Sequence, residues 1–184
     1  MPAITRAIDK AYSLGIIILA SASNKGANQD ITFPARLRSV FCIGAADGKG
    51  SPSGFNPPHR GVEKYSTLGE AVSGADVLGP DSESSSHATT TLRSGTSTAT
   101  PIAAAIASLL LDYTLQILDP VTGPGSTARI RKLFLAMSKA TVGSSYRYIV
   151  PWSILGANID TKKVIKDILK QSPGMPSMNR SNSF

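Results

Sequence analysis

Ser97 stands where a glycine turn meets a long apolar segment, in the stretch SGTSTATPIAAAIASLLLDY (residues 94–113). Pro101 lacks a backbone N–H, which the first turn of a helix tolerates, so the pattern predicts a helix that begins within a few residues of Ser97. The Ser97 hydroxyl then lies at the positive end of the helix dipole, beside N–H groups that favour developing negative charge. This is a possible geometry for a nucleophile, although on pattern alone such a serine is more often a helix N-cap.

The string GTSTATP (residues 95–101) bears on this choice, because it closely resembles the active-site serine motif of the subtilisin-family serine proteases, the subtilases. In that motif Gly-Thr-Ser-x-Ala-[Ser/Thr]-Pro opens a buried helix, and Ser97 takes the position of the nucleophile. Family members often carry Met and His where this chain has Thr98 and Ile102. Both positions vary in the family, so the resemblance implies that Ser97 is catalytic.

A second stretch, GIIILASASNKG (residues 15–26), resembles the subtilase strand and loop that end in Ala-Gly-Asn-x-Gly. The resemblance gives Asn24 the oxyanion-hole position, and Ser23 replaces the usual glycine. It also implies that four neighbouring residues bind substrate: Ser21, Ala22, Ser23 and Lys25. Many relatives carry Glu where this chain has Lys25, so a positive charge is expected at the rim of the pocket for the substrate side chain that precedes the scissile bond.

The chemistry that the resemblance implies is peptide-bond hydrolysis by acyl transfer, the activity of a serine endopeptidase on a polypeptide substrate. Ser97 Oγ would attack the peptide carbonyl, and the Asn24 amide and the Ser97 backbone N–H would hold the oxyanion. The likeness continues through FPARLRSVFCIGAAD (residues 33–47) and GEAVSGADVLGP (residues 69–80) and covers about residues 3–155. No cofactor or metal is expected, and a structural calcium ion is not readable from the sequence.

The other two members of a catalytic triad have no counterpart in these 184 residues. Subtilases place an Asp-[Ser/Thr]-Gly turn and a His-Gly-Thr motif before the oxyanion Asn, whereas the histidines here, His59 and His87, both follow Asn24 in polar loops. A serine without a base is a weak nucleophile. We therefore interpret the chain as the C-terminal half of a subtilase catalytic domain, inactive alone and partnered by the missing N-terminal half. The alternative is a non-catalytic, protease-like module that binds peptides or a partner protein.

The elements that position these residues follow a β/α order. Residues 2–15 predict a helix that Gly15 ends, and the apolar runs at 16–23 and 39–46 are typical of buried, adjacent parallel strands. A short strand is predicted within residues 69–80, a polar hairpin or loop at 81–95, a turn at 122–126 and further helices after Ser97, at 127–139 and at 159–170. The predicted fold class is α/β, with a largely parallel sheet and helices on both faces, as an incomplete subtilisin-like fold.

The predicted units are a partial peptidase domain (residues 1–158), a C-terminal amphipathic helix (159–170) and a disordered tail (171–184). The net charge of +7 comes partly from two basic clusters: Arg129, Arg131 and Lys132, then Lys162, Lys163, Lys166 and Lys170. The spacing of the second cluster favours a solvated helix face, and aromatic residues are only 6%, so we expect no nucleic-acid partner.

Two further features limit the class of protein. The longest apolar run, about residues 102–111, is shorter than a membrane span, so no membrane partner is expected. The first residues show no signal-peptide pattern, and the predicted location is cytoplasmic or unassigned, because we expect the N-terminus to be truncated. Cys42, the single cysteine, excludes an intrachain disulfide and is expected to be buried as a small hydrophobic side chain.

Overall fold

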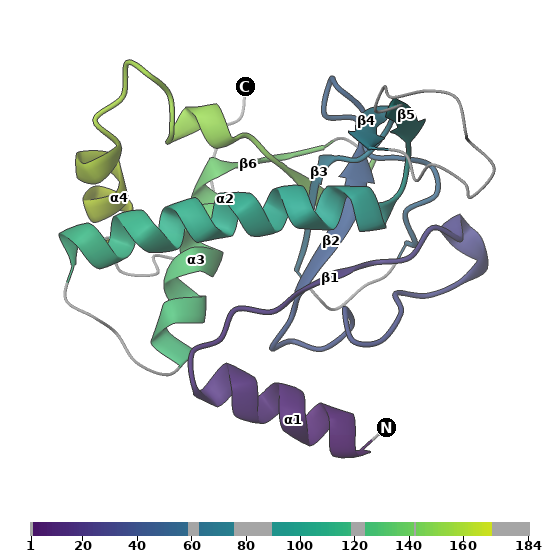
Figure 1. The fold of residues 1–184 in the computed structure, drawn as a ribbon, viewed down its shortest axis with the longest axis horizontal. Helices are drawn as coiled ribbons and strands as arrows, with labels where there is room; N and C mark the ends of the chain where they lie inside the picture. Colours follow the sequence, from purple (N-terminus) through teal and green to yellow (C-terminus); the bar gives the residue numbers. More distant parts are fainter. Residues whose placement is uncertain (1, 59–62, 76–89, 119–123, 142, 171–184) are drawn as a thin grey trace, which may run out of the picture.

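The computed structural model describes residues 2–58, 63–75, 90–118, 124–141 and 143–170. A five-stranded sheet with the order β1-β2-β3-β7-β6 forms the centre of the fold (Figure 1). Its strands are β1 (Leu19–Ser21), β2 (Phe41–Ala46), β3 (Lys64–Leu68), β6 (Ser138–Ala140) and β7 (Tyr146–Ile149). A small second sheet pairs β4 (Val72–Ala75) with β5 (Thr90–Arg93) in antiparallel orientation. The α-helices are α1 (Pro2–Ser13), α2 (Thr96–Ile117), α3 (Pro124–Met137) and α4 (Thr161–Lys170), and the short 3₁₀ helices are η1 (Gly26–Asn28) and η2 (Pro151–Ser153).

The main sheet is largely parallel, which confirms the α/β class. β1, β2, β3 and β7 run parallel to one another, and only β6 pairs antiparallel, with β7. All six residues of β2 are buried, as a strand with both faces covered requires. The register pairs Ala20 with Cys42 and Cys42 with Lys64, so β2 lies between β1 and β3.

Helix α2 crosses one face of the sheet and contacts β1, β2 and β3 (Figure 1). Small side chains on its inner face, among them Ala99, Ala103 and Ala107, are buried and let the helix approach the strands closely. The helix is longer than the apolar run predicts: at 22 residues it is long and apolar enough to cross a membrane by length and composition alone. Core helices pass the same test, and α2 has seven buried residues against this sheet and the neighbouring helices.

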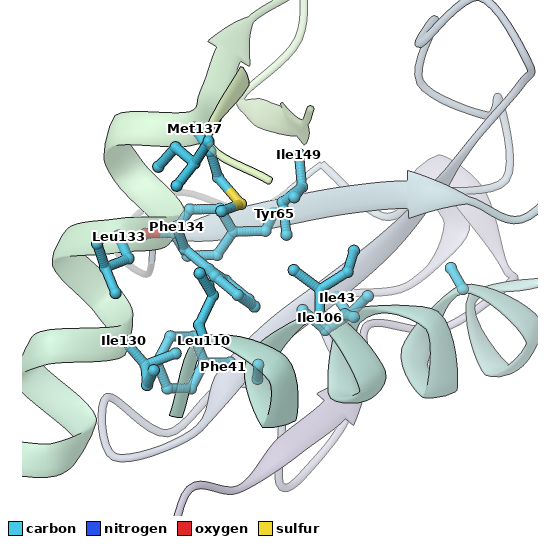
Figure 2. Packing of buried hydrophobic residues seen from close by; sticks show 14 of the residues in the cluster. Phe41, Ile43, Tyr65, Ile106, Leu110, Ile130, Leu133, Phe134, Met137 and Ile149 are labelled. Carbon is cyan, nitrogen blue, oxygen red and sulfur yellow. The ribbon is translucent and has the colours of Figure 1, made fainter. Parts of the chain in front are cut away.

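Aromatic side chains fill the centre of the core, between the sheet and the helices (Figure 2). The Phe134 ring from α3 meets the rings of Phe41 and Tyr65 edge to face, with centroids 5.5 and 5.3 Å apart. Edge-to-face contacts at this distance are favourable. They link α3 to the two central strands and so fix the surface on which α2 packs.

The N-terminal part of the chain agrees with the prediction in order but not in burial. Helix α1 ends near Gly15, which has φ +82° and donates its N–H to Tyr12 O, the left-handed cap that the sequence predicts. The predicted strand at residues 16–23 is confirmed only for the three residues of β1, which are half-buried, and Ile16 is 52% exposed. The reason is that β1 lies at the edge of the sheet and has one neighbouring strand, β2, in the described part of the chain.

Strands β3, β6 and β7 are absent from the sequence prediction, and α3 begins earlier than predicted. Pro124 and Gly125, predicted as a turn, open this helix, because the first turn tolerates proline. β4 lies within the segment predicted to hold a short strand, and β5 lies within the segment predicted as a hairpin or loop but pairs with β4, outside that segment. The remainder of both segments, residues 76–89, and the predicted tail at 171–184 lie outside the described residues.

Candidate active site

Ser97 is exposed in the first turn of α2, and a network of backbone contacts fixes that turn. The Gly95 N–H donates to Gly69 O at 2.8 Å, which joins the start of the helix to the loop after β3. Thr67 of β3 is buried and donates its hydroxyl to Ala99 O, also at 2.8 Å. The sheet and the loop thus hold the first turn in place while the Ser97 side chain faces solvent.

Asn24 follows β1 and reaches the same helix end. The Thr96 N–H, one of the helix N–H groups without an intrahelical acceptor, donates to Asn24 Oδ1 at 2.8 Å. A single point beside Gly95, where a Cβ atom would lie, is 3.0 Å from Asn24 Nδ2 and 3.3 Å from Ser97 Oγ. The fold therefore brings the Asn24 side chain, from the loop after β1, and the Ser97 side chain, from the first turn of α2, to the same place.

The orientation of the Asn24 amide follows from this contact. Because Oδ1 accepts the Thr96 N–H, the amide NH₂ group is left to donate. Thr98 and Ala99 donate their N–H groups to Gly95 O at 3.1 and 3.2 Å, and the Ser97 N–H has no acceptor within the described ranges. Two hydrogen-bond donors, Asn24 Nδ2 and the Ser97 N–H, are thus available beside Ser97 Oγ.

Glycine at position 95 is a steric requirement of this arrangement. A Cβ atom there would stand closer to the Asn24 amide than van der Waals contact allows, and tight against Ser97 Oγ. Position 69 also has no room for a side chain, because a Cβ on Gly69 would lie 2.6 Å from Ala45 Cβ and 3.0 Å from Gly95 O. The sequence gives no local signal for the role of Thr67. For Gly69, the one signal is its position at the start of the GEAVSGADVLGP stretch.

The four predicted substrate-binding residues lie at and just after the end of β1, and they differ in burial. Ser21 ends the strand and is half-buried, whereas the Ala22 side chain is fully buried and its carbonyl accepts the Thr32 N–H. Ser23 has φ +133°, in a region that glycine adopts much more readily than serine. Ser23 stands where the resembling motif has glycine, and its backbone conformation is one that favours glycine.

Lys25 is exposed next to Asn24, at the start of η1. The following residue, Gly26, donates its N–H to Phe55 O at 2.8 Å, and a Cβ on it would lie 3.1 Å from Gly54 O. This contact ties the Asn24 loop to the loop after β2. Lys25 thus extends from a fixed turn beside the two candidate catalytic side chains.

A general base for Ser97 is not found among the described residues. No hydrogen bond to Ser97 Oγ joins it to another described side chain, and both histidines, His59 and His87, lie outside the described residues. In the same part of the chain, no group of three His, Cys, Asp or Glu side chains is placed to hold a metal ion. The arrangement provides a hydroxyl and an anion-stabilising pair of donors.

Comparison with known proteins gives one family. The sequence pattern of the subtilase family, Peptidase_S8, matches residues 2–148. The chain is 33% identical over 115 residues to subtilisin DY of Bacillus licheniformis, a match that covers 59% of this chain and 37% of that protein. It is 32% identical over 126 residues to the serine protease AprX of Bacillus subtilis, covering 59% of this chain and 28% of the relative. The chain thus spans well under half the length of these relatives.

Solved structures show the same fold. The patellamide maturation protease PatA superimposes with a TM-score of 0.64 at 21% identity, over 88% of this chain and 56% of that one. The prenylagaramide maturation protease PagA gives 0.62 at 24% identity, over 77% and 47%. The PatG macrocyclase domain gives 0.60 at 25% identity, over 77% and 40%.

Proposed function

The chain belongs to the subtilase family, and from this premise we propose that it supplies the nucleophile and the oxyanion hole of a serine endopeptidase. Ser97 Oγ attacks the carbonyl carbon of a peptide bond and forms the acyl-enzyme after the amine leaves. Asn24 Nδ2 and the Ser97 N–H donate to the oxyanion of the tetrahedral intermediate. The substrate is a polypeptide.

The observation that carries this proposal is the contact between Thr96 and Asn24. The hydrogen bond from the Thr96 N–H to Asn24 Oδ1 holds the amide beside Ser97 Oγ with its NH₂ group free to donate. A turn-forming Asn would not need this contact with a helix that follows it by 72 residues. Hydrogen-bond donors that are fixed before the reaction need no reorganisation when the oxyanion forms, which is how such a site lowers the barrier.

The proton of Ser97 must pass to a base and then to the leaving amine. Because these 184 residues contain neither of the family's two other triad motifs, we place the base and its orienting Asp on a polypeptide segment outside them. That segment either precedes these residues in the same protein or is a separate chain. On this proposal the 184-residue chain alone performs no peptide hydrolysis.

Labelling by a fluorophosphonate, which reacts with activated serines, tests the proposal. The chain alone should show neither labelling nor peptidase turnover. Fusion or addition of a segment with the Asp-[Ser/Thr]-Gly and His-Gly-Thr motifs, from the coding sequence upstream of Met1 or from a relative, should restore both. Ser97→Ala should then abolish both activities, whereas Ser108→Ala, a matched change at an exposed serine of α2, should leave them intact.

Two results would count against the proposal in different ways. Labelling that persists in the complemented Ser97→Ala variant would remove Ser97 from the nucleophile role. Robust Ser97-dependent hydrolysis by the 184-residue chain alone would show that the base lies within it. Peptide binding without labelling in every complemented form would instead identify the non-catalytic binding module.

Lys25 gives this proposed site an expected preference for the charge of the substrate. Its exposed ammonium group beside Asn24 should favour acidic substrate side chains just before the scissile bond, because opposite charges attract over this short range. Cleavage of a peptide library by the complemented enzyme and by its Lys25→Glu variant measures the effect. An unchanged preference, or one insensitive to salt, would remove Lys25 from the pocket.

A further inference from the structure

β1 and β2 separate just before the loop that carries Asn24. Ser21 is the last residue of β1 in register with β2, opposite Ile43, and the Ala22 N–H donates to Ile43 O at 2.9 Å. Because every second residue of a strand bonds on the same side, the next residue of β2 that faces this edge is Ala45. Ala45 is fully buried, so its backbone N–H and C=O need hydrogen-bond partners.

The Asn56 side chain occupies the place that a strand would have beside Ala45. Its Oδ1 accepts the Ala45 N–H at 2.9 Å, and its Nδ2 donates to Ala45 O at 2.7 Å. A carboxamide has the same donor and acceptor as a peptide group, so one side chain satisfies both backbone groups. An asparagine that only forms a turn bonds to backbone about two residues away. These contacts instead reach a strand 11 residues earlier in the chain.

The two Asn56 bonds hold a turn at residues 53–56 against β2. The Ser53 N–H also donates to Ala45 O, at 3.0 Å, and the Asn56 N–H donates to Ser53 O, at 3.0 Å. The first and the last residue of the turn are therefore both attached to Ala45. Phe55 lies between them, so the turn sets the direction of its carbonyl group.

The Phe55 carbonyl contacts the loop that carries Asn24. Gly26 donates its N–H to Phe55 O at 2.8 Å, and a Cβ on Gly26 would lie 3.1 Å from Gly54 O. Backbone thus packs directly on backbone, and a shift of one segment is transmitted to the other. Asn24 stands between two fixed points, the bond from Ala22 to β2 before it and the bond from Gly26 to the turn after it.

We propose that Asn56 is a positioning residue for the oxyanion donor Asn24, a role that depends on the function proposed above. Asn56 holds the turn, and the turn holds Gly26 through Phe55 O. Gly26 in turn fixes the end of the loop from which the Asn24 amide reaches Ser97. Functional groups must be held to within about 0.5 Å of their productive geometry. Loss of the two Asn56 bonds therefore displaces the amide and slows the reaction without removing a contact with the substrate.

Hydrogen exchange in the 184-residue chain, followed by NMR, tests this role without any enzymatic activity. The Thr96 N–H is bonded to Asn24 Oδ1, and the Thr98 N–H is bonded to Gly95 O in the same turn of α2. Asn56→Ala should raise the ratio of the Thr96 exchange rate to the Thr98 exchange rate at least about threefold, because a displaced Asn24 exposes Thr96 alone. A general loss of stability raises both rates and leaves the ratio unchanged. An unchanged ratio would overturn the proposal.

Asp47→Ala is the matched control in the same loop. Asp47 Oδ1 accepts the N–H groups of Lys49 and Ser51 at 2.9 and 2.8 Å, so this change also removes two bonds between a side chain and the backbone, but none to Ala45. The exchange ratio should stay within about 1.5-fold of that of the unmodified chain, and a rise equal to that of Asn56→Ala would overturn the proposal.

A second variant, Asn56→Asp, gives the measurement if Asn56→Ala does not fold. It is similar in size and keeps the acceptor for the Ala45 N–H, but it loses the donor to Ala45 O. The exchange ratio should rise in this variant as well, by less than in Asn56→Ala. An unchanged ratio in Asn56→Asp would equally contradict the positioning role.

Kinetics of the complemented enzyme separate positioning from folding. Asn56→Ala should lower kcat at least about tenfold and change KM less than about twofold, because the substrate contacts remain and only stabilisation of the transition state is weakened. In the Asn24→Ala background, the same change should lower kcat less than about twofold, because the donor that Asn56 positions is gone. Equal losses of kcat in both backgrounds would overturn the proposal. A complemented enzyme without any activity would contradict the proposed function alone, since the exchange ratio decides separately whether Asn56 positions Asn24.

Discussion

Among single residues, Asn24 combines a structural and a chemical role in different atoms of one side chain. Oδ1 accepts the Thr96 N–H at the start of α2, and Nδ2 is the proposed oxyanion donor. Asn24→Asp keeps an acceptor for Thr96 and places a negative charge at the helix N-terminus, where it is favourable. We expect it to retain or raise the free energy of unfolding while lowering turnover of the complemented enzyme.

Asn24→Ala removes both roles, and it should lower the free energy of unfolding by about 1 kcal/mol, as loss of a helix cap does. Turnover should fall in both variants, by about 10²–10³-fold, the range that subtilisin itself shows on losing one such donor. Urea unfolding and peptidase assays measure the two effects. Full activity in Asn24→Asp would exclude the donor role while leaving the structural one intact.

Ser23 provides a prediction about backbone strain. Its φ of +133° costs a non-glycine residue about 1–3 kcal/mol, more than the entropy that glycine loses on folding, which is at most about 1 kcal/mol. Ser23→Gly should therefore raise the free energy of unfolding by about 1 kcal/mol in urea titrations. Ser21→Gly is the matched control in β1, where glycine should destabilise by about 0.5–1 kcal/mol. Stabilisation by both changes, or by neither, would contradict the strain argument.

The residues of the site were predictable to different extents. Ser97 and Asn24 stand in short strings of fixed spacing, and the fold brings them together as those strings indicate. The roles of Thr67 and Gly69 were not predictable, because they depend on contacts with Ala99 and Gly95 about thirty positions away. Such contacts exist only once β3 lies under α2, and no local pattern encodes them.

Among the strands of the main sheet, those with a continuous apolar run could be predicted from the sequence, and those with polar residues could not. β2 is a continuous apolar run and was predicted, whereas β3 and β7 mix Lys64, Thr67 and Arg147 with tyrosines and were not. Tertiary contacts make these polar residues compatible with the sheet: Lys64 is only 2% exposed and its ammonium lies 4.9 Å from the Tyr146 ring centroid. Arg147 bonds to Ser138 across the β6–β7 pair.

The same central strands should make stability depend on alkaline pH. Burial raises the pKa of the Cys42 thiol in β2 from 9.0 to about 12, with Lys64 acting in the opposite direction. Burial also raises the pKa values of Tyr65 and Tyr146 and lowers that of Lys64. For Cys42, the unfolded chain loses its proton above pH 9 while the folded chain keeps it, so this contribution to stability is present below pH 9 and is lost toward pH 12.

Cys42→Ala isolates that contribution. Between pH 8 and pH 10.5, the free energy of unfolding should fall by about 2 kcal/mol less in Cys42→Ala than in the unmodified chain, because an unfolded thiol with pKa 9.0 gains that much from ionisation. Urea titrations at a series of pH values measure the difference. The control is Ser66→Ala, at a buried position of β3 without a titratable group. Its free energy of unfolding should decrease over this pH range as much as that of the unmodified chain. The prediction would be contradicted if the free energy of unfolding depended on pH in the same way in Cys42→Ala and in the unmodified chain.

For the whole molecule, the side of the fold that carries α1 and β1 differs from the rest. β1 pairs with β2 on one edge, and no strand of the described chain lies on the other. Helix α1 has no buried residue, and three large apolar side chains nearby in sequence are exposed: Ile4, Leu14 and Ile16. A free strand edge next to exposed apolar side chains promotes association between chains. We call these three residues the N-terminal apolar set.

The 184-residue chain on its own should therefore self-associate in a concentration-dependent way, visible as a rising average mass in sedimentation experiments. Replacing the N-terminal apolar set by Gln should lower that mass toward the monomer and reduce binding of a hydrophobic dye, because less apolar surface is then gained by association. The control replaces three other exposed leucines by Gln, Leu109 and Leu115 of α2 and Leu135 of α3, with a similar loss of apolar surface. If association depends on the β1 side, the average mass of the control variant should equal that of the unmodified chain. An equal decrease in both variants would show that association follows total exposed apolar area, and a monomeric unmodified chain would show that the free edge of β1 does not drive it.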